Sequence, residues 1–242
     1  MWSTKILTLF PELFPGPLGY SVVGKALKDG LWSLDAINIR DYAFDKHQTV
    51  DDTPYGGGGG MVMKADVMAH AIDSCCDHRY PIYYLSPRGK VFNQKVAEEM
   101  VGFGGGNFIC GRFEGVDERV FLEYDVVELS LGDFVLSCGD VAAYPILDAC
   151  VRLIPGVLDG KSALYEESFG SAPGYENLLE YPHYTKPAIW RGHEVPDVLR
   201  GGNHAQIQEW RLQKAIEKTK SVRPELLDRC TVGGKNEFTE EV

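Results

Sequence analysis

Several familiar signatures are missing from this sequence, and each absence disfavours a class of protein. No apolar run approaches membrane-spanning length. Residues Met1 to Phe14 lack the charged start and the small-residue cleavage site of a secretory signal, so we expect a cytoplasmic protein with no membrane partner. No Gly-Lys-Ser/Thr closes a glycine-rich loop, and no Gly-x-Gly-x-x-Gly follows the first expected strand. ATP-binding and dinucleotide-binding enzymes are therefore disfavoured.

The six cysteines contain no Cys-x-x-Cys pair. A chain of 242 residues can bury a core without disulfide staples, so reduced thiols are expected. Cys75 and Cys76 are adjacent and badly placed to share a metal ion. We therefore predict no protein-ligated metal site.

Positive charge is scarce overall, because the formal net charge is −11. This argues against unspecific adhesion to nucleic acid, which depends on lysine and arginine. Most of the acidity lies in residues 1–160, and the segment from Pro182 to Arg223 holds eight basic side chains against four acidic ones. A local basic surface is available in the second part of the chain.

Short apolar runs alternate with helical patterns in the first part of the chain. This alternation predicts an α/β fold with a parallel sheet. The expected strands are Lys5–Phe10, Ile82–Leu85, Phe108–Cys110 and Val126–Leu129, and the expected helices are Ala65–Cys76, Gln94–Val101, Glu118–Tyr124 and Val141–Leu153.

The pattern dissolves around Leu158 to Gly174 into Asp-Gly, serine, glycine and proline, which is typical of a linker. We predict a first domain over 1–160, a linker over 161–174 and a small, mostly helical domain over 175–242. In the last of these, Gln206–Lys220 has an amphipathic pattern with Arg211, Lys214 and Lys218 on one face. Phosphate contacts and ordinary surface charge are both compatible with that face.

Three glycine-containing turns each follow an expected strand, at Leu85–Gly89, Cys110–Gly115 and Leu129–Asp133. Loops at the carboxyl ends of parallel strands converge, and their glycines let the backbone approach a flat ligand. Together they predict a nucleoside-sized pocket. A separate run, Gly56–Gly60, indicates either a mobile surface loop or a backbone surface that closes over a ligand.

In these residues the chain resembles the bacterial tRNA (guanine-N1)-methyltransferases of the knotted SPOUT class, nearly from end to end. The block from Cys110 to Arg119 is the most specific part of the resemblance. The other shared motifs are Leu9–Glu12, Thr49–Asp52 with the glycine run, Leu85–Pro87, Ile154–Leu158, Pro182–Tyr184 and Gly202–Ala205.

The resemblance implies a deep trefoil knot in the first domain and a homodimer with active sites at its interface. It also implies a knot pocket that holds S-adenosylmethionine. The implied cofactor-binding residues are Leu85, Ser86, Pro87, Gly111, Glu114, Ser130, Leu131, Gly132 and Leu136. The implied substrate is the guanosine immediately 3′ of the anticodon of a tRNA (position 37).

Chemistry constrains the catalytic group. N1 of guanine carries a proton at neutral pH, so a base must remove it before methylation, and charge then develops on O6. A carboxylate can serve as the base, and an arginine fork or Mg²⁺ can stabilise O6. By resemblance the arginine is Arg152 and the base is Glu167, with Glu114 added to the catalytic group and Glu166 as an alternative helper.

The sequence departs from the family pattern at several positions. Glu167 replaces the usual aspartate, which adds a methylene to the base. Gly59 and Ala142 replace prolines, Cys138 replaces a glycine beside the pocket, and residues Ser171–Tyr175 form a short insertion. These departures bear on loop stiffness and on the seating of the base, and Cys138 is either a packed small side chain or a reactive thiol.

For tRNA contacts the resemblance implies Asp51, Gly58, Gly59, His183 and Asn203. Three other interpretations remain: a knotted methyltransferase acting on ribose or another base, an RNA-binding protein with little activity, and a nucleotide-binding oxidoreductase. The block from Cys110 disfavours the first, and the retained pocket loops disfavour the second.

Overall fold

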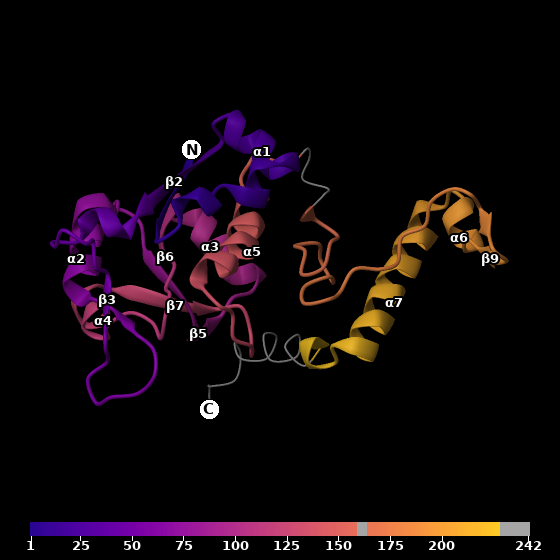
Figure 1. The fold of residues 1–242 in the computed structure, drawn as a ribbon. Coiled ribbons are helices and arrows are strands. Elements are labelled where there is room, and N and C mark those ends of the chain that lie inside the picture. The colour runs from indigo at the N-terminus through magenta and orange to yellow at the C-terminus, as the bar shows by residue number, and fades with distance from the viewer. Residues whose placement is uncertain (159–163, 228–242) are drawn as a thin grey trace, which may run out of the picture. The chain divides into compact units, whose positions relative to one another are not determined.

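The computed structural model describes residues 1–158 and 164–227. The chain divides into two compact units, Met1–Leu158 and Asp159–Val242. Figure 1 shows the helices and strands of both units. No helix among the described residues has both the length and the apolarity required to cross a membrane.

A five-stranded, all-parallel sheet forms the centre of the first unit, in the order β2-β1-β6-β5-β7. Consecutive strands β1 and β2 are neighbours, whereas β6 lies between β1 and β5, so the chain must pass over β5 to reach the edge strand β7. The strands are β1 (Trp2–Thr8), β2 (Trp32–Asn38), β5 (Ile82–Val91), β6 (Gly105–Ile109) and β7 (Val126–Ser130).

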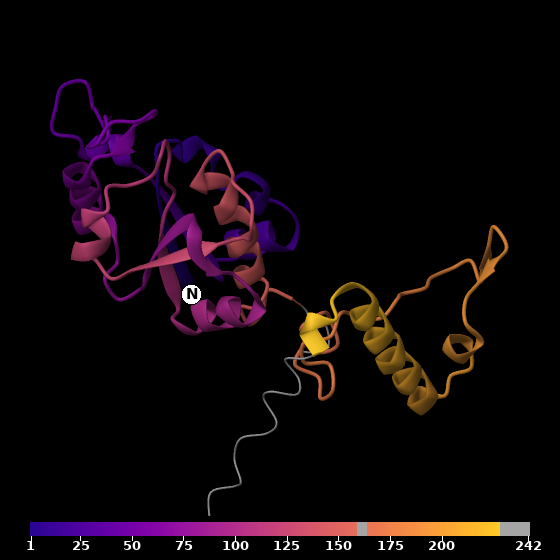
Figure 2. The same ribbon diagram turned by 90° about the horizontal axis from the view of Figure 1, so that it is seen from below.

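Helices cover both faces of this sheet (Figure 2). The core beneath α1, α3 and α5 includes Ile6, Phe108 and Leu147, and the core beneath α2 and α4 includes Leu7, Ile72 and Ile109. Neighbouring residues of one strand thus serve opposite cores, as the strand period of two requires. The helices are α1 (Ser21–Lys28), α2 (Ala65–Cys75), α3 (Gln94–Gly102), α4 (Arg119–Glu123) and α5 (Gly139–Val151).

Shorter elements complete the first unit. The 3₁₀ helices are η1 (Pro11–Leu13), η2 (Gly16–Gly19) and η3 (Ile39–Tyr42), and the antiparallel pair β3 (Asp51–Asp52) and β4 (Val62–Met63) flanks the glycine run. The parallel sheet and the helices predicted from the sequence are confirmed, with ends shifted by a few residues. The strand β2 and the helix α1 were not predicted.

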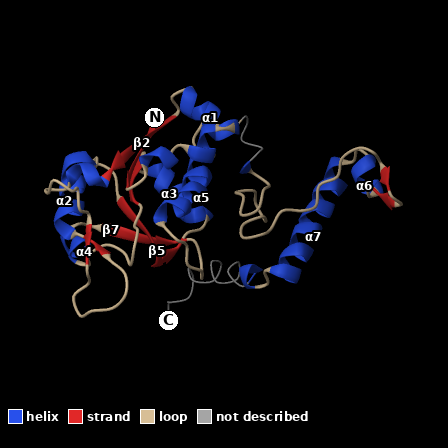
Figure 3. Cartoon of the chain, in the orientation of Figure 1, coloured by secondary structure: helices blue, strands red, loops and turns tan. Residues whose placement is uncertain are grey.

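The second unit contains one long helix, α7 (His204–Val222), and the short helix α6 (Asp197–Arg200), which contacts α7. The hairpin of β8 (Ile189–Trp190) and β9 (His193–Glu194) lies past one end of α7, near α6 (Figure 3). Asn203 caps α7, because its side-chain oxygen accepts a hydrogen bond from the Gln206 amide. The loop before the hairpin packs on α7 through an apolar cluster that includes Tyr181 and Ala215.

The start of α5 lies against the end of β6, and only glycine fits there. A Cβ atom on Gly139 would lie 2.8 Å from the Cys110 Cα and 2.9 Å from the Gly111 amide nitrogen. We expect Gly139→Ala to destabilise the protein by about 1–3 kcal/mol, since backbone must move to relieve the overpacking.

Urea unfolding checks this, with Gly102→Ala as the matched control. A Cβ at Gly102 has no neighbour within 4 Å, so alanine there should be neutral or stabilising by up to about 1 kcal/mol through helix propensity. Equal unfolding free energies for the two variants would show that a Cβ atom at Gly139 does not destabilise the fold.

Candidate active site

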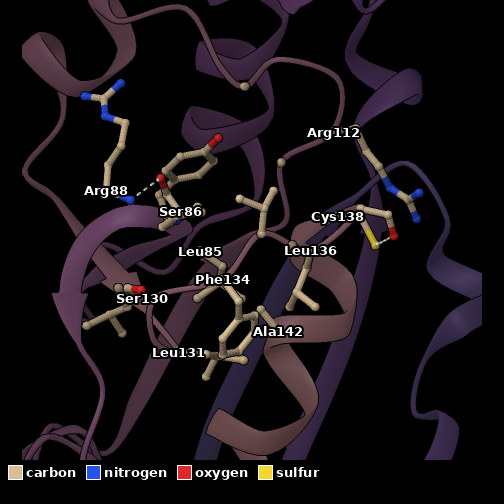
Figure 4. A pocket seen from close by; sticks show the side chains of 18 of the residues that line it. Leu85, Ser86, Arg88, Arg112, Ser130, Leu131, Phe134, Leu136, Cys138 and Ala142 are labelled. Atoms are coloured by element: carbon tan, nitrogen blue, oxygen red, sulfur yellow. Dashed lines mark hydrogen bonds between the residues drawn. The ribbon is translucent and has the colours of Figure 1, made fainter.

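A pocket of about 290 Å³ lies beside residues Tyr84–Arg88 of β5 and at the carboxyl ends of β6 and β7 (Figure 4). Its walls are the three glycine-containing segments that the sequence indicated, together with the start of α5. In Figure 4, Phe134, Leu131 and Ala142 lie together at one end of the pocket, and Ser86 and Arg88 lie at the other. The position agrees with the rule that ligands of parallel sheets bind beyond the carboxyl ends of the strands.

The first wall is an irregularity in β5. Leu85 and Lys90 both register with Leu129 of β7, so the residues between them are pushed out of the ladder. Ser86 holds this bulge by accepting a hydrogen bond from the Arg88 amide at 3.2 Å. The Gly89 backbone lies close to β7: a Cβ atom on Gly89 would lie 2.3 Å from the backbone of Glu128. The segment predicted as a turn after β5 is therefore a bulge within it.

The second wall, after β6, is fixed by a buried ion pair. Arg112 donates to the fully buried Asp140 at 2.8 and 2.9 Å, and the Thr8 hydroxyl donates to the other carboxylate oxygen. The Arg112 guanidinium also lies 4.4 Å from the Phe10 ring centroid. This arrangement joins the ends of β1 and β6 to the start of α5. Removing one partner would leave a buried charge uncompensated.

Glu114 connects the pocket to the glycine run. Its amide donates to the Met61 carbonyl at 2.9 Å, and the Met63 amide donates to the Gly115 carbonyl at 2.9 Å. A Cβ on Gly60 would lie 2.3 Å from the Glu114 carboxylate. The last glycine of the run, Gly60, therefore lies against Glu114. Cβ atoms on Gly56 to Gly59 would meet nothing within 4 Å.

The third wall follows β7. Ser130 Oγ accepts a hydrogen bond from the Gly132 amide and donates one to the Gly132 carbonyl, both at 3.1 Å. Gly132 has a φ of +145°, a conformation that side chains rarely adopt, which explains a glycine at this turn. Gly132 shapes the wall without lining the pocket.

The structure brings together eight of the nine residues that the resemblance assigned to the cofactor. These are Leu85, Ser86, Pro87, Gly111, Glu114, Ser130, Leu131 and Leu136. Cys138 and Ala142, two departures from the family pattern, line the same pocket. Arg152 lies one residue beyond α5, as its C-cap, and does not line the pocket. Asp51 lies in β3, in register with Met63.

In the second unit, Glu167 and His183 line one hollow of about 360 Å³. Tyr165, Glu166, Glu180, Tyr181 and Arg211 complete its walls. The His183 ring lies 2.8 Å from the Glu180 carboxylate. The candidate base Glu167 and the candidate tRNA contact His183 therefore share a cavity.

The basic face predicted on α7 is partly neutralised. Arg211 pairs with Glu166 at 3.3 Å and Lys214 pairs with Glu217 at 2.6 Å, whereas Lys218 is exposed. Asn203 serves as the helix cap described above. Among the described residues, no group of three or more His, Cys, Asp or Glu side chains could hold a metal ion.

Sequence reasoning missed several residues of the pocket. Phe113 and Phe134 are half exposed on its wall, and Tyr84 lies beneath Gly111, where a Cβ would approach the Tyr84 ring to 2.7 Å. Their only signal in the sequence was aromatic character beside the glycine turns. Arg112 lies in the block from Cys110 to Arg119, but its partner Asp140 was not predicted.

Comparison with known proteins agrees with this geometry. A family model described as tRNA (Guanine-1)-methyltransferase TrmD matches residues 1–229. A tRNA (guanine-N(1)-)-methyltransferase from Roseobacter denitrificans is 49% identical over 229 residues, covering 93% of each chain. Proteins of the same name from Anaplasma marginale and Ehrlichia canis are 50% and 49% identical and cover 96% of this chain and 97% of their own. The chain belongs to this family.

Membership of the tRNA (guanine-N1)-methyltransferase family confirms the resemblance and makes this chain an enzyme of the transferase class. The interpretations as a nucleotide-binding oxidoreductase and as an RNA-binding protein with little activity are thereby set aside.

Cys138, on the pocket wall, should be the most reactive of the five thiols that the structure describes. Cys75, Cys76, Cys110 and Cys150 are buried, and Cys138 is partly exposed. Burial raises the pKa of both Cys76 and Cys150 to about 12, so their thiolates are scarce at neutral pH. Iodoacetamide labelling followed by peptide mapping should find Cys138 modified first.

S-adenosylmethionine should slow the labelling of Cys138 if it occupies the pocket. The Cys138→Ser variant identifies the peptide, and Cys230, outside the described residues, is followed on its own peptide. Faster labelling at any buried cysteine would contradict the assigned accessibilities.

Proposed function

We propose that the protein transfers a methyl group from S-adenosylmethionine to N1 of the guanosine immediately 3′ of the anticodon (position 37) in tRNA. The observation that carries the proposal is the convergence of eight expected cofactor residues, from three separate segments, on one pocket. Family membership supports the same reaction on a tRNA guanine.

The pocket fits a nucleoside with a charged tail. Its volume of about 290 Å³ is close to the lower end of the roughly 300–1,000 Å³ range of small-molecule sites. Leu85, Leu131 and Leu136 offer an apolar surface to a flat base, and Glu114 offers a carboxylate to an ammonium group. Gly111 and Gly139 present bare backbone where any Cβ would clash. S-adenosylmethionine, when bound, supplies an electrophilic methyl group.

The chain's own residues would prepare the guanine. Glu167 would remove the proton from N1, and Arg152 would hold the negative charge that develops on O6. Mg²⁺ could add to the stabilisation of O6, and its requirement is tested by chelation during the assay. Asp51 would accept from the guanine edge, Gly58 and Gly59 would cover a flanking base, and His183 would contact the tRNA. Asn203 would act through the start of α7, which it caps.

We also propose the deep trefoil knot and the homodimer. The chain passes from β6 over β5 to the edge strand β7, and the start of α5 then returns to the end of β6. This path of the chain supports the proposed knot. Exposed apolar side chains around the pocket support a partner subunit there, because such patches mark interfaces. They are Phe113, Phe134, Val135 and Leu136, with Val141 on α5. A cytoplasmic location agrees with a tRNA substrate.

Mass spectrometry of nucleosides tests the proposal. Purified protein, S-adenosylmethionine and an unmodified tRNA transcript with guanosine 3′ of the anticodon should yield 1-methylguanosine at that position. A transcript with adenosine there is the matched control and should remain unmethylated. Methylation of ribose, or of another base in the control transcript, would overturn the assignment.

A further inference from the structure

Three side chains from two segments of the second unit meet beside the candidate base. The Glu166 carboxylate oxygen Oε2 accepts a hydrogen bond from the Tyr181 hydroxyl at 2.9 Å and lies 3.3 Å from Arg211 Nη1. The Arg211 guanidinium also lies 4.8 Å from the Tyr181 ring centroid. Each member of this group, Glu166, Tyr181 and Arg211, thus contacts the other two.

Tyr181 is the buried member of this group. Tyr181 is 8% exposed and belongs to the apolar cluster that packs the loop on α7. Burial, followed by the hydrogen bond to Glu166, raises the pKa of Tyr181 to about 12, so the phenol stays protonated and remains a donor at neutral pH. The half-buried Arg211 and the buried phenol both contact the same oxygen of Glu166, and these two contacts restrain its side chain.

The loop that carries the base is short and tightly folded. The Gly170 amide donates to the Glu167 carbonyl at 2.8 Å, and a Cβ on Gly170 would lie 2.5 Å from the Tyr165 carbonyl oxygen. Ser168 Oγ accepts a hydrogen bond from the Glu180 amide at 3.0 Å. Glu166 and Glu167 are adjacent in this loop, with Cα atoms about 3.8 Å apart, so a shift of the Glu166 backbone also displaces Glu167.

From this geometry we infer that Glu166, Tyr181 and Arg211 form a positioning cluster that sets the orientation of Glu167. The inference rests on the proposed function, in which Glu167 is the base. It assigns Arg211 to the enzyme's internal structure and not to a tRNA phosphate. It also gives the adjacent carboxylates different roles, although both line the hollow: Glu166 bonds to Tyr181 and Arg211, and Glu167 is the base that this pairing orients.

Three conservative variants test the cluster: Glu166→Gln, Tyr181→Phe and Arg211→Lys. Tyr181→Phe keeps the ring and removes only the hydroxyl, so the fold should survive, and thermal unfolding checks this. Each variant should lower kcat about tenfold to a hundredfold, because small misplacements of a catalytic group are costly. KM for tRNA and the Kd for S-adenosylmethionine should change by less than about twofold, since the effect acts on orientation and not on binding.

The salt dependence of tRNA binding separates positioning from phosphate contact. Loss of a phosphate contact weakens binding and reduces the salt slope by about one. Lys218→Gln and Arg211→Gln each remove one positive charge from the same helix, and we expect the reduced slope in Lys218→Gln but not in Arg211→Gln. A reduced slope and raised KM in Arg211→Gln, with unchanged kcat, would overturn the inference.

The same variants made in a Glu167→Gln background identify the residue through which they act. Single-turnover rates with labelled S-adenosylmethionine should show no further loss when Glu166→Gln or Tyr181→Phe is added, because their target is already gone. Equal losses in both backgrounds would contradict the inference. If Glu167→Gln itself kept the wild-type rate, the assigned base would be wrong, and that failure is distinct from one in which only the cluster variants are neutral.

Discussion

Glu167→Gln should lower kcat for methylation of tRNA by about 10²–10⁴-fold, because general-base catalysis contributes that much to a typical reaction. Glutamine keeps the length and polarity of the side chain and removes only its capacity to accept a proton. N1 of guanine would then keep its proton, and the ring would remain a poor nucleophile. Rapid-quench measurements of 1-methylguanosine formation give the chemical step directly.

Glu167→Asp is the informative companion variant. It retains a carboxylate and shortens its reach by one methylene, so we expect an intermediate loss of about tenfold to a hundredfold from misplacement. S-adenosylmethionine should bind both variants as it binds the wild type, since the pocket is lined by residues between Tyr84 and Ala142. A wild-type kcat in Glu167→Gln would show that Glu167 is not the catalytic base.

Local pattern predicted β5 and β6, inside the sheet, because each contains a run of five buried residues that stands out from a polar surrounding. It also predicted the edge strand β7, although only Leu129 and Ser130 are buried there. β2 was missed because only Trp32 is fully buried in it, and its polar residues break the apolar run. It is an edge strand, where half-burial weakens the periodic signal.

The pocket was predictable in outline because it is built from turns. Glycine after a strand is visible in sequence, and the rule about carboxyl ends places three such turns together. The Arg112–Asp140 pair was not predictable in this way. It requires β6, α5 and Thr8 of β1 to meet, and the side chains of Thr8 and Asp140 are 132 residues apart in the chain. No local pattern carries that information.

Arg211 shows the limit of a helical wheel. The wheel correctly places this arginine on a basic face of α7, but it says nothing about what another segment offers to that face. The structure adds Glu166 and Tyr181, from the loop 45 and 30 residues earlier in the chain. The helical pattern left phosphate contact and ordinary surface charge both open for Arg211, and the structure pairs it with Glu166.

Arg152→Ala should lower kcat by about 10²–10³-fold, because removing one donor to a developing oxyanion typically has that effect. Arg152→Lys should recover only part of the loss, since an ammonium group keeps the charge but not the planar fork. Steady-state kinetics with saturating S-adenosylmethionine measure both variants. A change confined to KM would show that Arg152 binds substrate without acting on the transition state.

In the proposed homodimer, the Arg152→Ala and Glu167→Gln chains should restore activity to each other. If each active site combines Arg152 of one subunit with Glu167 of the other, a heterodimer of Arg152→Ala and Glu167→Gln chains contains one doubly altered site and one intact site. Unfolding and refolding an equal mixture of the two inactive homodimers should then restore about a quarter of wild-type activity, since half of the random pairs are heterodimers with one working site each. Each variant refolded alone should stay inactive. Persistent inactivity of a mixture that contains heterodimers, verified by differential tagging, would place both residues of each site on one chain.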